Sequence, residues 1–142
     1  MKTETPNIRA VRPGHGRELM IVWKGGVESV VDVAGHLAAY AIFAPLREDE
    51  AFAAVSVGEW GWSVHWSDDM EISSDTLWRL SLEQGAAWLR HWRSGHGMTQ
   101  SQAASAVGVG PRMWRYYEAG EHPVPKTVRL ACSGLDAQAR AA

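Results

Sequence analysis

Short apolar runs in the first third of the chain are typical of β-strands. Residues 8–11 and 19–23 are rich in β-forming side chains, and residues 27–33 (V-E-S-V-V-D-V) form a third run. The sequence Lys-Gly-Gly separates the last two runs, and a Gly-Gly pair supplies the positive φ that a two-residue hairpin turn requires. The pattern therefore predicts a β-hairpin from Leu19 to Val33.

The next segments change between helical and strand character. Residues 34–43 (A-G-H-L-A-A-Y-A-I-F) are apolar and alanine-rich, and a proline closes them, so they predict a short buried helix. Residues 53–66 return to strand character, and Trp62, Val64 and Trp66 alternate there with polar residues. A period of two predicts these three side chains on one face of a sheet.

A helix is predicted to begin at Ser73 or Ser74, because Asp75 in its first turn suits both the cap and the helix dipole. Apolar residues between 77 and 82 supply its buried face, and residues 86–94 continue the helix until two glycines end it. The first part of the chain is therefore predicted to be a small antiparallel α+β domain with a helix leading out of it.

Residues 98–120 have the outline of two short helices joined by a tight turn. Thr99 and Gln102 form a capping box, in which each side chain satisfies a free backbone donor of the other residue. Gly108 stands where a left-handed helix end is expected, and Pro111 stands at the first position of the next helix, where a missing N–H costs nothing. This outline is that of a helix-turn-helix.

The second of these helices, Pro111 to Ala119, is predicted to have an inner and an outer face. Trp114 and Tyr117 point inward, whereas Arg112, Arg115 and Tyr116 point elsewhere. In the first helix, small residues at 103 and 104 and a valine at 107 form the buried face. After two prolines, one or two closing helices are predicted from the apolar residues Val128, Leu130, Ala131 and Leu135.

Charge divides the chain in two. Residues 1–84 hold 7 Lys or Arg against 13 Asp or Glu, a net charge of −6, whereas residues 85–142 hold 7 against 3, a net charge of +4. Such asymmetry indicates an anion-binding part, nucleic acid included. We therefore expect an acidic α+β domain at 1–84, for interaction or dimerisation, and an all-α DNA-binding domain at 85–142.

Several other classes of protein are not supported. The longest apolar run, residues 37–46, is far shorter than the roughly 18 to 20 residues that cross a bilayer, and no secretory pattern stands at the N-terminus, so we expect a cytoplasmic protein. Cys132 is the single cysteine, the six histidines are scattered, and no P-loop, G-x-G-x-x-G or G-x-S-x-G occurs. We expect no cofactor, no metal and no catalytic residue; an enzyme with an unfamiliar active site in the first domain is the alternative.

Three motifs in the first part of the chain carry a family resemblance. They are V-D-V at 31–33, P-L-R-x-x-x-x-F at 45–52 and W-S-D-D-M-E-I-S-S-D-T-L at 66–77. Over roughly residues 8–80 they resemble a family of short bacterial proteins known only as a domain of unknown function. That family is often encoded beside a small toxin-like partner or fused to a helix-turn-helix, so the resemblance implies an antitoxin-like or regulatory role. Trp66 and Ile72 are expected to be core residues.

The string T-Q-x-x-x-A-x-x-x-G-V-x-x-x-x-x-x-x-x-E-x-G, residues 99–120, is similar to the lambda-repressor and Cro class of regulators. The resemblance implies that the glutamine after the cap, Gln100, touches DNA phosphate. It further implies that base edges are read from Pro111, Arg112, Met113 and Tyr116. The chain departs from the class at Ala103, where leucine is usual, at Trp114, where a small aliphatic residue is usual, and at Pro111, which cannot donate a hydrogen bond.

Elementary chemistry ranks these contacts. A guanidinium can bond guanine O6 and N7 together, so Arg112 is the expected direct reader, with about 1 to 3 kcal/mol of discrimination, and Met113 and Tyr116 are further base contacts. Phosphate contacts, which position a protein without specifying sequence, are assigned to Thr99, Gln100, Arg115, Lys126 and Arg129.

Two functions remain open from the sequence. The first is a sequence-specific transcriptional regulator of double-stranded DNA, expected to be a homodimer because one recognition helix reads only a few base pairs. The second is an antitoxin-like module that binds a partner protein, with or without autoregulatory DNA binding.

Overall fold

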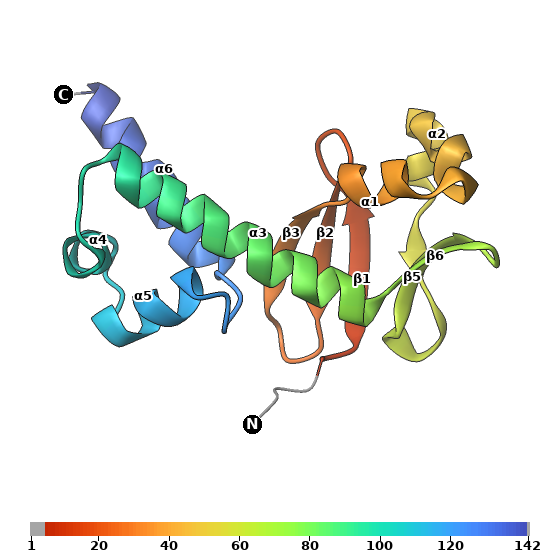
Figure 1. Ribbon diagram of the computed structural model, residues 1–142, viewed down its shortest axis with the longest axis horizontal. Coiled ribbons are helices and arrows are strands. Elements are labelled where there is room, and N and C mark those ends of the chain that lie inside the picture. The colour runs from red at the N-terminus through yellow and green to blue at the C-terminus, as the bar shows by residue number, and fades with distance from the viewer. Residues whose placement is uncertain (1–4, 142) are drawn as a thin grey trace. The chain divides into compact units, whose positions relative to one another are not determined.

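The computed structural model describes residues 5–141, and its internal contacts divide the chain into two compact units after Ser81. The first unit contains β1 (Ile8–Pro13), β2 (Glu18–Trp23), β3 (Glu28–Asp32), α1 (Ala34–Ala39), the 3₁₀ helix η1 (Ala41–Arg47), α2 (Asp49–Ala53), β4 (Ser56–Val57), the 3₁₀ turn η2 (Glu59–Gly61), β5 (Ser63–Ser67) and β6 (Met70–Ser73). Helix α3 (Ser74–Gly95) begins in this unit, and the second unit adds α4 (Gln100–Val107), α5 (Pro111–Glu118) and α6 (Lys126–Ala141). The predicted fold class, an α+β part followed by an all-α part, is confirmed (Figure 1).

The first sheet is antiparallel in the order β1-β2-β3. In β2, Leu19, Ile21 and Trp23 are buried while the residues between them are half-buried, so this alternation places one face of the sheet on the core. The predicted hairpin from Leu19 to Val33 is confirmed. Its two turn glycines, at 25 and 26, have φ values of 99° and 96°.

A buried hydroxyl pair connects this sheet to α3. The indole Nε1 of Trp23 donates to Ser29 Oγ at 3.0 Å, and the hydroxyl of Ser81 donates to the same oxygen at 2.8 Å. Both serines are buried, and these two bonds give the polar groups of Trp23, Ser29 and Ser81 a partner inside the core. Trp78 packs its ring edge-on against Trp23 at 4.9 Å beside this network.

The prediction of one buried helix over residues 34–43 is wrong. Helix α1 ends at Ala39 and has no buried residue, and an extended Tyr40 separates it from η1. The buried side chains of the segment, Phe43 and Leu46, both lie in η1. The large apolar residues after Tyr40 are therefore buried, whereas the alanines of α1 stay at the surface. Burying an alanine removes little apolar area from water and so stabilises the fold less.

The strand predicted over residues 53–66 is only partly correct. Ala53 ends helix α2, and the strands are confined to β4 and β5, with η2 between them. Val64 is buried and Trp66 packs on the core, but Trp62 is 54% exposed because it lies at the end of η2, before the strand begins. The period of two therefore does not extend back to Trp62.

The second sheet has the order β4-β5-β6 in the described part of the chain, and its β5–β6 hairpin places Val64 opposite Ile72. Ile72 is buried, and Trp66 Nε1 donates to the carbonyl of Phe52 at 2.8 Å. The core roles expected of Trp66 and Ile72 are thus confirmed.

Helix α3 begins where the sequence predicts, since the backbone N–H of Thr76 donates to Ser73 Oγ at 3.2 Å. It continues through Gly85, a residue that weakens helices. A Cβ added at Gly85 would lie 3.0 Å from the Val124 side chain. Glycine therefore lets the loop before α6 approach α3 closely, whereas a larger residue would press on the Val124 side chain.

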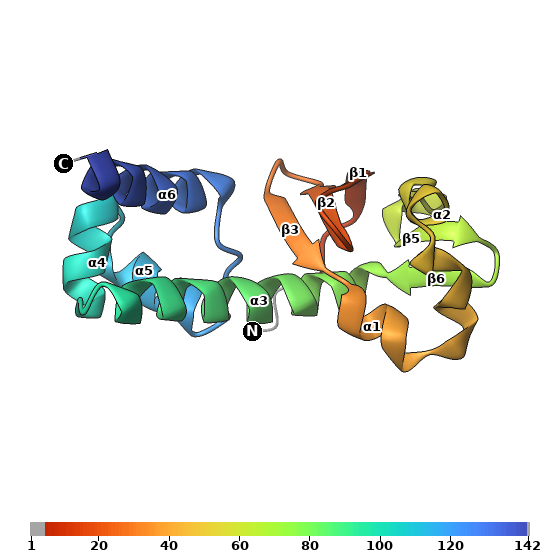
Figure 2. The ribbon, with the colours of Figure 1, turned by 90° about the horizontal axis from the view of Figure 1, so that it is seen from above.

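The closing segment is a single helix, α6, which buries Val128 and Cys132. Leu130, one of the apolar residues from which the closing helices were predicted, is 60% exposed, because the helical period that turns residues 128 and 132 inward turns residue 130 outward. Figure 2 shows α6 running in the same direction as the C-terminal part of α3. Asp136 of α6 accepts from Trp92 Nε1 at 3.2 Å and pairs with His96 Nε2 at 2.8 Å.

Candidate nucleic-acid interface

The capping box that opens α4 has the predicted geometry. Thr99 Oγ1 accepts from the backbone N–H of Gln102 at 3.1 Å, and Gln102 Oε1 accepts from the backbone N–H of Thr99 at 2.9 Å. Two free donors of the helix start are therefore satisfied by local side chains. The start of the first helix of the motif is fixed independently of tertiary packing.

The turn between α4 and α5 is also built as predicted. Gly108 is left-handed, with φ 86° and ψ 29°, and both its N–H and that of Val109 donate to the carbonyl of Ala104 at 2.9 Å. Gly110 caps α5 and Pro111 occupies its first position. Helix α5 ends at Glu118, one residue before the predicted end.

The inner faces of the two helices meet in one apolar cluster. Ala103, Ala104 and Trp114 are fully buried there, together with most of Tyr117. Trp114 lies 6.3 Å from the Trp92 ring of α3, measured between ring centroids. Ala103 and Ala104 of α4 and Trp114 of α5 therefore belong to one packed core.

Glu118 is a buried acceptor that the sequence analysis did not identify as a site residue. Its carboxylate accepts from Arg93 Nε at 2.7 Å and Arg93 Nη2 at 3.0 Å, and also from Trp114 Nε1 and Gln100 Nε2. Arg90 donates to its backbone carbonyl at 2.7 Å. One carboxylate therefore joins α3, α4 and α5.

This network controls the ionisation of both partners. Burial raises the pKa of Glu118, but hydrogen bonds from Arg93, Trp114 and Gln100, with the Arg93 charge, outweigh it and leave the pKa below its usual range. The hydrogen bonds that Arg93 donates to Glu118 raise the pKa of Arg93. Arg93 and Glu118 are thus both charged near neutral pH. Two parallel hydrogen bonds between charged groups fix the relative orientation of the two side chains.

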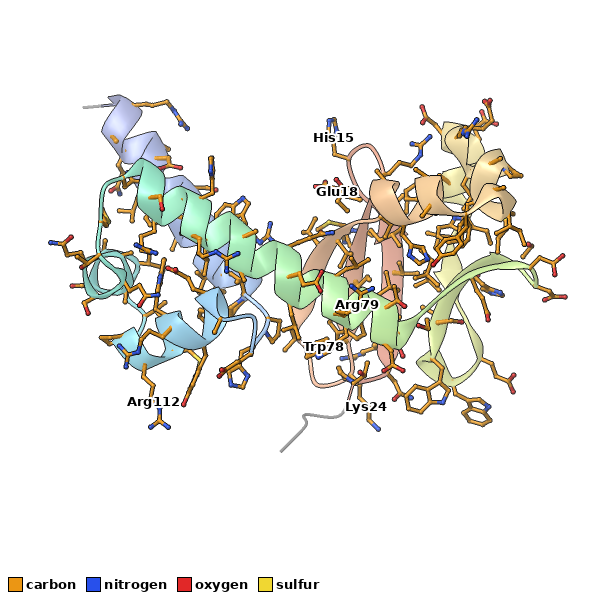
Figure 3. All side chains as sticks on the ribbon, viewed as in Figure 1. His15, Glu18, Lys24, Trp78, Arg79 and Arg112 are labelled. Carbon is orange, nitrogen blue, oxygen red and sulfur yellow. The ribbon has the colours of Figure 1, made fainter. Side chains whose placement is uncertain are left out.

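The outer face of α5 carries the residues predicted to read bases. Arg112 and Met113 are exposed and Tyr116 is half-buried, and Figure 3 shows Arg112 extending away from the ribbon. Arg112 Nε donates to the Tyr116 hydroxyl at 2.8 Å, with the guanidinium carbon 5.5 Å from the centre of the ring. The structure therefore brings these two predicted readers together.

The residues predicted to contact phosphate differ in how exposed they are and in what they already contact. Arg115 is exposed on α5, and Lys126 is exposed at the first position of α6. The Arg129 guanidinium lies 4.9 Å from the centre of the Trp88 ring. Gln100 is half-buried, and its amide donates to Glu118 at 3.3 Å, while Thr99 is engaged in the capping box.

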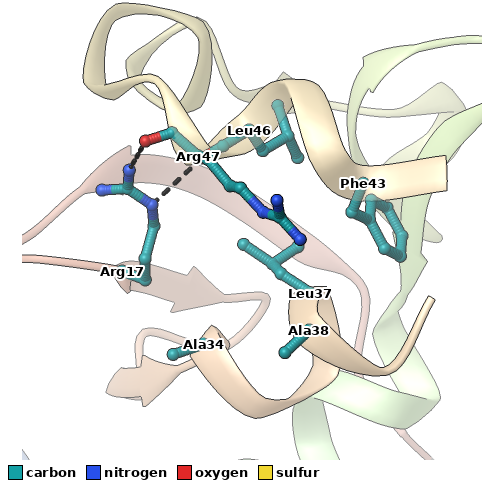
Figure 4. A pocket seen from close by; sticks show the side chains of 7 residues that line it. All are labelled: Arg17, Ala34, Leu37, Ala38, Phe43, Leu46 and Arg47. Carbon is teal, nitrogen blue, oxygen red and sulfur yellow. Dashed lines mark hydrogen bonds between the residues drawn. The ribbon is translucent and has the colours of Figure 1, made fainter. Parts of the chain in front are cut away.

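A small pocket in the first unit offers no comparable chemistry. It has a volume of about 140 Å³ and is lined by apolar side chains with Arg17 and Arg47 beside them (Figure 4). The Arg17 guanidinium donates to the carbonyls of Leu46 and Arg47 and to Asp49. These bonds make Arg17 a structural link between the turn before β2 and η1.

Metal and thiol chemistry find no support in the described residues. No group of three or more His, Cys, Asp or Glu side chains there could hold a metal ion. Cys132 is fully buried, and burial followed by the Asp136 charge raises its pKa to about 11, as expected of a thiol that only packs. No helix between residues 5 and 141 has both the length and the hydropathy needed to span a bilayer.

Comparison with known proteins agrees with this division of the chain. Residues 84–142 match the family described as a helix-turn-helix domain. A crystal structure from Nitrosomonas europaea ATCC 19718, described as a "putative DNA binding protein", is 30% identical and has a TM-score of 0.54; the match covers 96% of this chain and 90% of that one. No curated protein matches.

Residues 8–83 match the family described as "Protein of unknown function (DUF2442)". The matched segment contains both three-stranded sheets and the start of α3. The chain belongs to the DUF2442 family and continues into a helix-turn-helix domain.

Proposed function

We propose that this protein is a transcriptional regulator that binds double-stranded DNA and places α5 in the major groove. The observation that carries the proposal is the outer face of α5, where Arg112, Met113 and Arg115 are exposed on a helix whose inner face is fixed by Trp114 and Glu118. A preceding helix and a tight glycine turn are the usual support of such a recognition helix. The helix-turn-helix family match and the description of the Nitrosomonas protein support the same conclusion.

Arg112 is the proposed base reader. Its Nε is engaged by Tyr116, so its two terminal nitrogens are left to contact guanine O6 and N7, the commonest specific contact in the major groove. In this complex Tyr116 positions the Arg112 side chain and also lies close enough to contact a base itself. Met113 offers an apolar contact of the kind that a thymine methyl accepts.

Phosphate contacts position the helix. Arg115 and Lys126 are the leading candidates because both are exposed, and Arg129 and the cap residue Thr99 complete the set. Gln100 is ranked behind them, since a phosphate contact would require its amide to share or leave the hydrogen bond to Glu118.

We further infer a lambda-repressor or Cro type of complex, in which a homodimer reads two half-sites about one helical turn, roughly 34 Å, apart. The proposal assigns no catalytic reaction to the chain.

Fluorescence anisotropy with the DNA upstream of the protein's own gene tests the proposal. Arg112→Ala should weaken binding by about 10-fold or more, within the 1 to 3 kcal/mol of a bidentate base contact. Arg140→Ala, which removes an equal charge from the exposed end of α6, is the matched control and should have little effect. Equal losses in the two variants would mean non-specific attraction and would contradict direct readout.

A second arm separates base readout from phosphate contact. Replacing single guanines by 7-deazaguanine removes the N7 acceptor, and wild-type binding should fall at one position while Arg112→Ala binding does not fall further. Arg115→Ala should instead weaken all DNA sequences alike and reduce the salt slope of log K by about one.

A second candidate function is an antitoxin-like role, in which the chain binds a partner protein encoded nearby. What favours it is the acid excess of residues 1–84, with a net charge of −6, in a unit that contains exposed tryptophans. Co-expression of the native operon, followed by co-purification at high salt, tests it. A neighbouring product that never co-purifies would contradict this role and leave DNA binding unaffected.

A further inference from the structure

Two tryptophan side chains of the first unit, which are separated in the sequence by one glycine, are exposed. Trp60 is 77% exposed and Trp62 is 54% exposed, although tryptophan carries the largest apolar surface of any residue. Both rings line a groove of about 510 Å³ between η2, β5 and β6. Exposed apolar surface with a polar rim is typical of an interaction site.

The groove has a strongly one-sided charge. Its lining includes the carboxylates of Glu59, Asp68 and Glu71, and its remaining residues are glycine, serine and the single His65. No lysine or arginine is among the described residues that line it. Aromatic faces and carboxylates both attract cations, and a guanidinium fits them best because it stacks on a ring and bonds a carboxylate in a bidentate manner.

Backbone geometry holds Trp60 in this position. Its φ of 59° is the only positive value of a non-glycine residue in the described chain. The Asn7 side-chain amide donates to its carbonyl at 2.6 Å, and its indole Nε1 donates to Glu59 at 3.0 Å. An exposed ring that is fixed in advance loses little entropy when a ligand binds.

We infer that this groove binds an arginine-bearing segment of a partner protein, with the guanidinium between the Trp60 and Trp62 rings and the carboxylates. Nucleic acid and anionic membranes are repelled by the same charge that attracts such a segment. The inference rests on the second candidate function, for which it names the surface and the chemistry of the partner, and it is independent of DNA binding.

Titration of the full chain with a capped peptide that alternates glycine and arginine tests the inference. In ¹⁵N NMR spectra, the indole N–H signals of Trp60 and Trp62 should shift saturably, whereas those of the buried Trp23 and Trp114 should not. Peptides with citrulline or glutamate in place of arginine should produce no such shifts. Shifts that are absent, equal for the three peptides or centred on other residues would overturn the inference.

Trp60→Gly is the informative variant, because glycine adopts a positive φ without strain and the folded state is therefore not weakened. We expect peptide binding to weaken about 2- to 5-fold, the range of an exposed cation–π contact, with an unfolding midpoint that is unchanged or higher. Glu71→Gln should also weaken binding, and Glu50→Gln, outside the groove, is its matched control. Unchanged affinity in Trp60→Gly would overturn the inference.

Three further outcomes separate this inference from the proposed functions. Indole shifts that appear on raising the concentration of the protein alone would identify a second copy as the occupant and overturn the partner assignment. Anisotropy with upstream DNA should be the same for Trp60→Gly and wild type. If the operon partner co-purifies but the arginine peptide does not bind, the groove assignment fails while the antitoxin-like role stands.

Discussion

The Nε of Arg112 donates to the phenolic oxygen of Tyr116 at 2.8 Å, one helical turn further along α5. The guanidinium carbon also lies 5.5 Å from the centre of the tyrosine ring. A long arginine side chain normally samples many rotamers at the surface, and ordering it on binding costs free energy. In the proposed DNA complex, Tyr116 would reduce that cost by holding the Arg112 guanidinium in place before binding, and would so act on base readout through Arg112.

Tyr116→Phe should therefore lower discrimination without lowering general DNA affinity. Removing the hydroxyl leaves the ring but no acceptor for Arg112 Nε, so we expect about 3- to 10-fold weaker binding to the specific site, equivalent to a hydrogen bond of about 1 kcal/mol. Anisotropy on the specific site and on a scrambled sequence measures the two affinities. Tyr40→Phe, at an exposed tyrosine of the first unit, is the control; an equal loss on both DNA sequences would assign Tyr116 to phosphate contact instead.

Glu118→Gln should strongly destabilise the helix-turn-helix unit. The Glu118 side chain is 3% exposed and that of Arg93 is 22% exposed, so the change leaves a largely buried guanidinium without its counter-charge. Breaking such a pair costs about 3 kcal/mol, which urea unfolding followed by circular dichroism can measure. Glu121→Gln removes an equal charge three residues later at an exposed position and should change stability by less than about 0.5 kcal/mol. Similar losses in the two variants would contradict the role of the buried pair.

Stability should also fall in acid because of the same carboxylate. The pKa of Glu118 in the folded state lies below the ordinary glutamate value of 4.5, so its stabilising effect is fully present above about pH 4.5 and is lost as the pH falls through the folded pKa. Urea midpoints measured at successive pH values should therefore decline below about pH 4.5. In Glu118→Gln this part of the decline should be absent, and an identical pH profile in the two proteins would contradict the assignment.

Features that depend on neighbouring residues could be predicted from the sequence. The capping box of Thr99 and Gln102, the left-handed Gly108 and the Gly-Gly hairpin turn each involve atoms a few residues apart, and their stereochemistry admits few alternatives. The same holds for the outward position of Arg112, which follows from the helical period once Trp114 is buried.

Features that depend on distant residues could not be predicted. Glu118 and Arg93 are 25 residues apart, and no local pattern distinguishes this glutamate from a solvated one. Residues 34–47 show a second limit, because their helical propensity is overruled by the positions at which Phe43 and Leu46 enter the core. Trp62 shows a third limit. Its alternation with polar residues predicted that it shares a sheet face with Val64 and Trp66, whereas it lies at the end of a 3₁₀ turn and is exposed.

Cys132 should be unreactive in the folded protein. Burial raises its pKa from the ordinary thiol value of 9.0 to about 11, which reduces the thiolate fraction at neutral pH about a hundredfold, and its side chain is fully buried. We expect a chromogenic disulfide reagent at pH 8 to react at once in concentrated urea and very slowly in buffer. A fast reaction in buffer, at a rate independent of stability, would show that the second core opens locally around α6.

Ser29→Ala tests the buried hydroxyl network of the first unit. Ser29 Oγ accepts from both Trp23 Nε1 and the Ser81 hydroxyl, so its removal leaves two buried donors without an acceptor, and we expect a cost of about 2 kcal/mol. Ser81→Ala removes only a donor and should cost about 1 kcal/mol. Since the two serines share one bond, the double variant should be less destabilised than the sum of the single variants, as urea unfolding would show. Strict additivity would mean that the two hydroxyls are not coupled across β3 and α3, and that Ser29 acts through Trp23 alone.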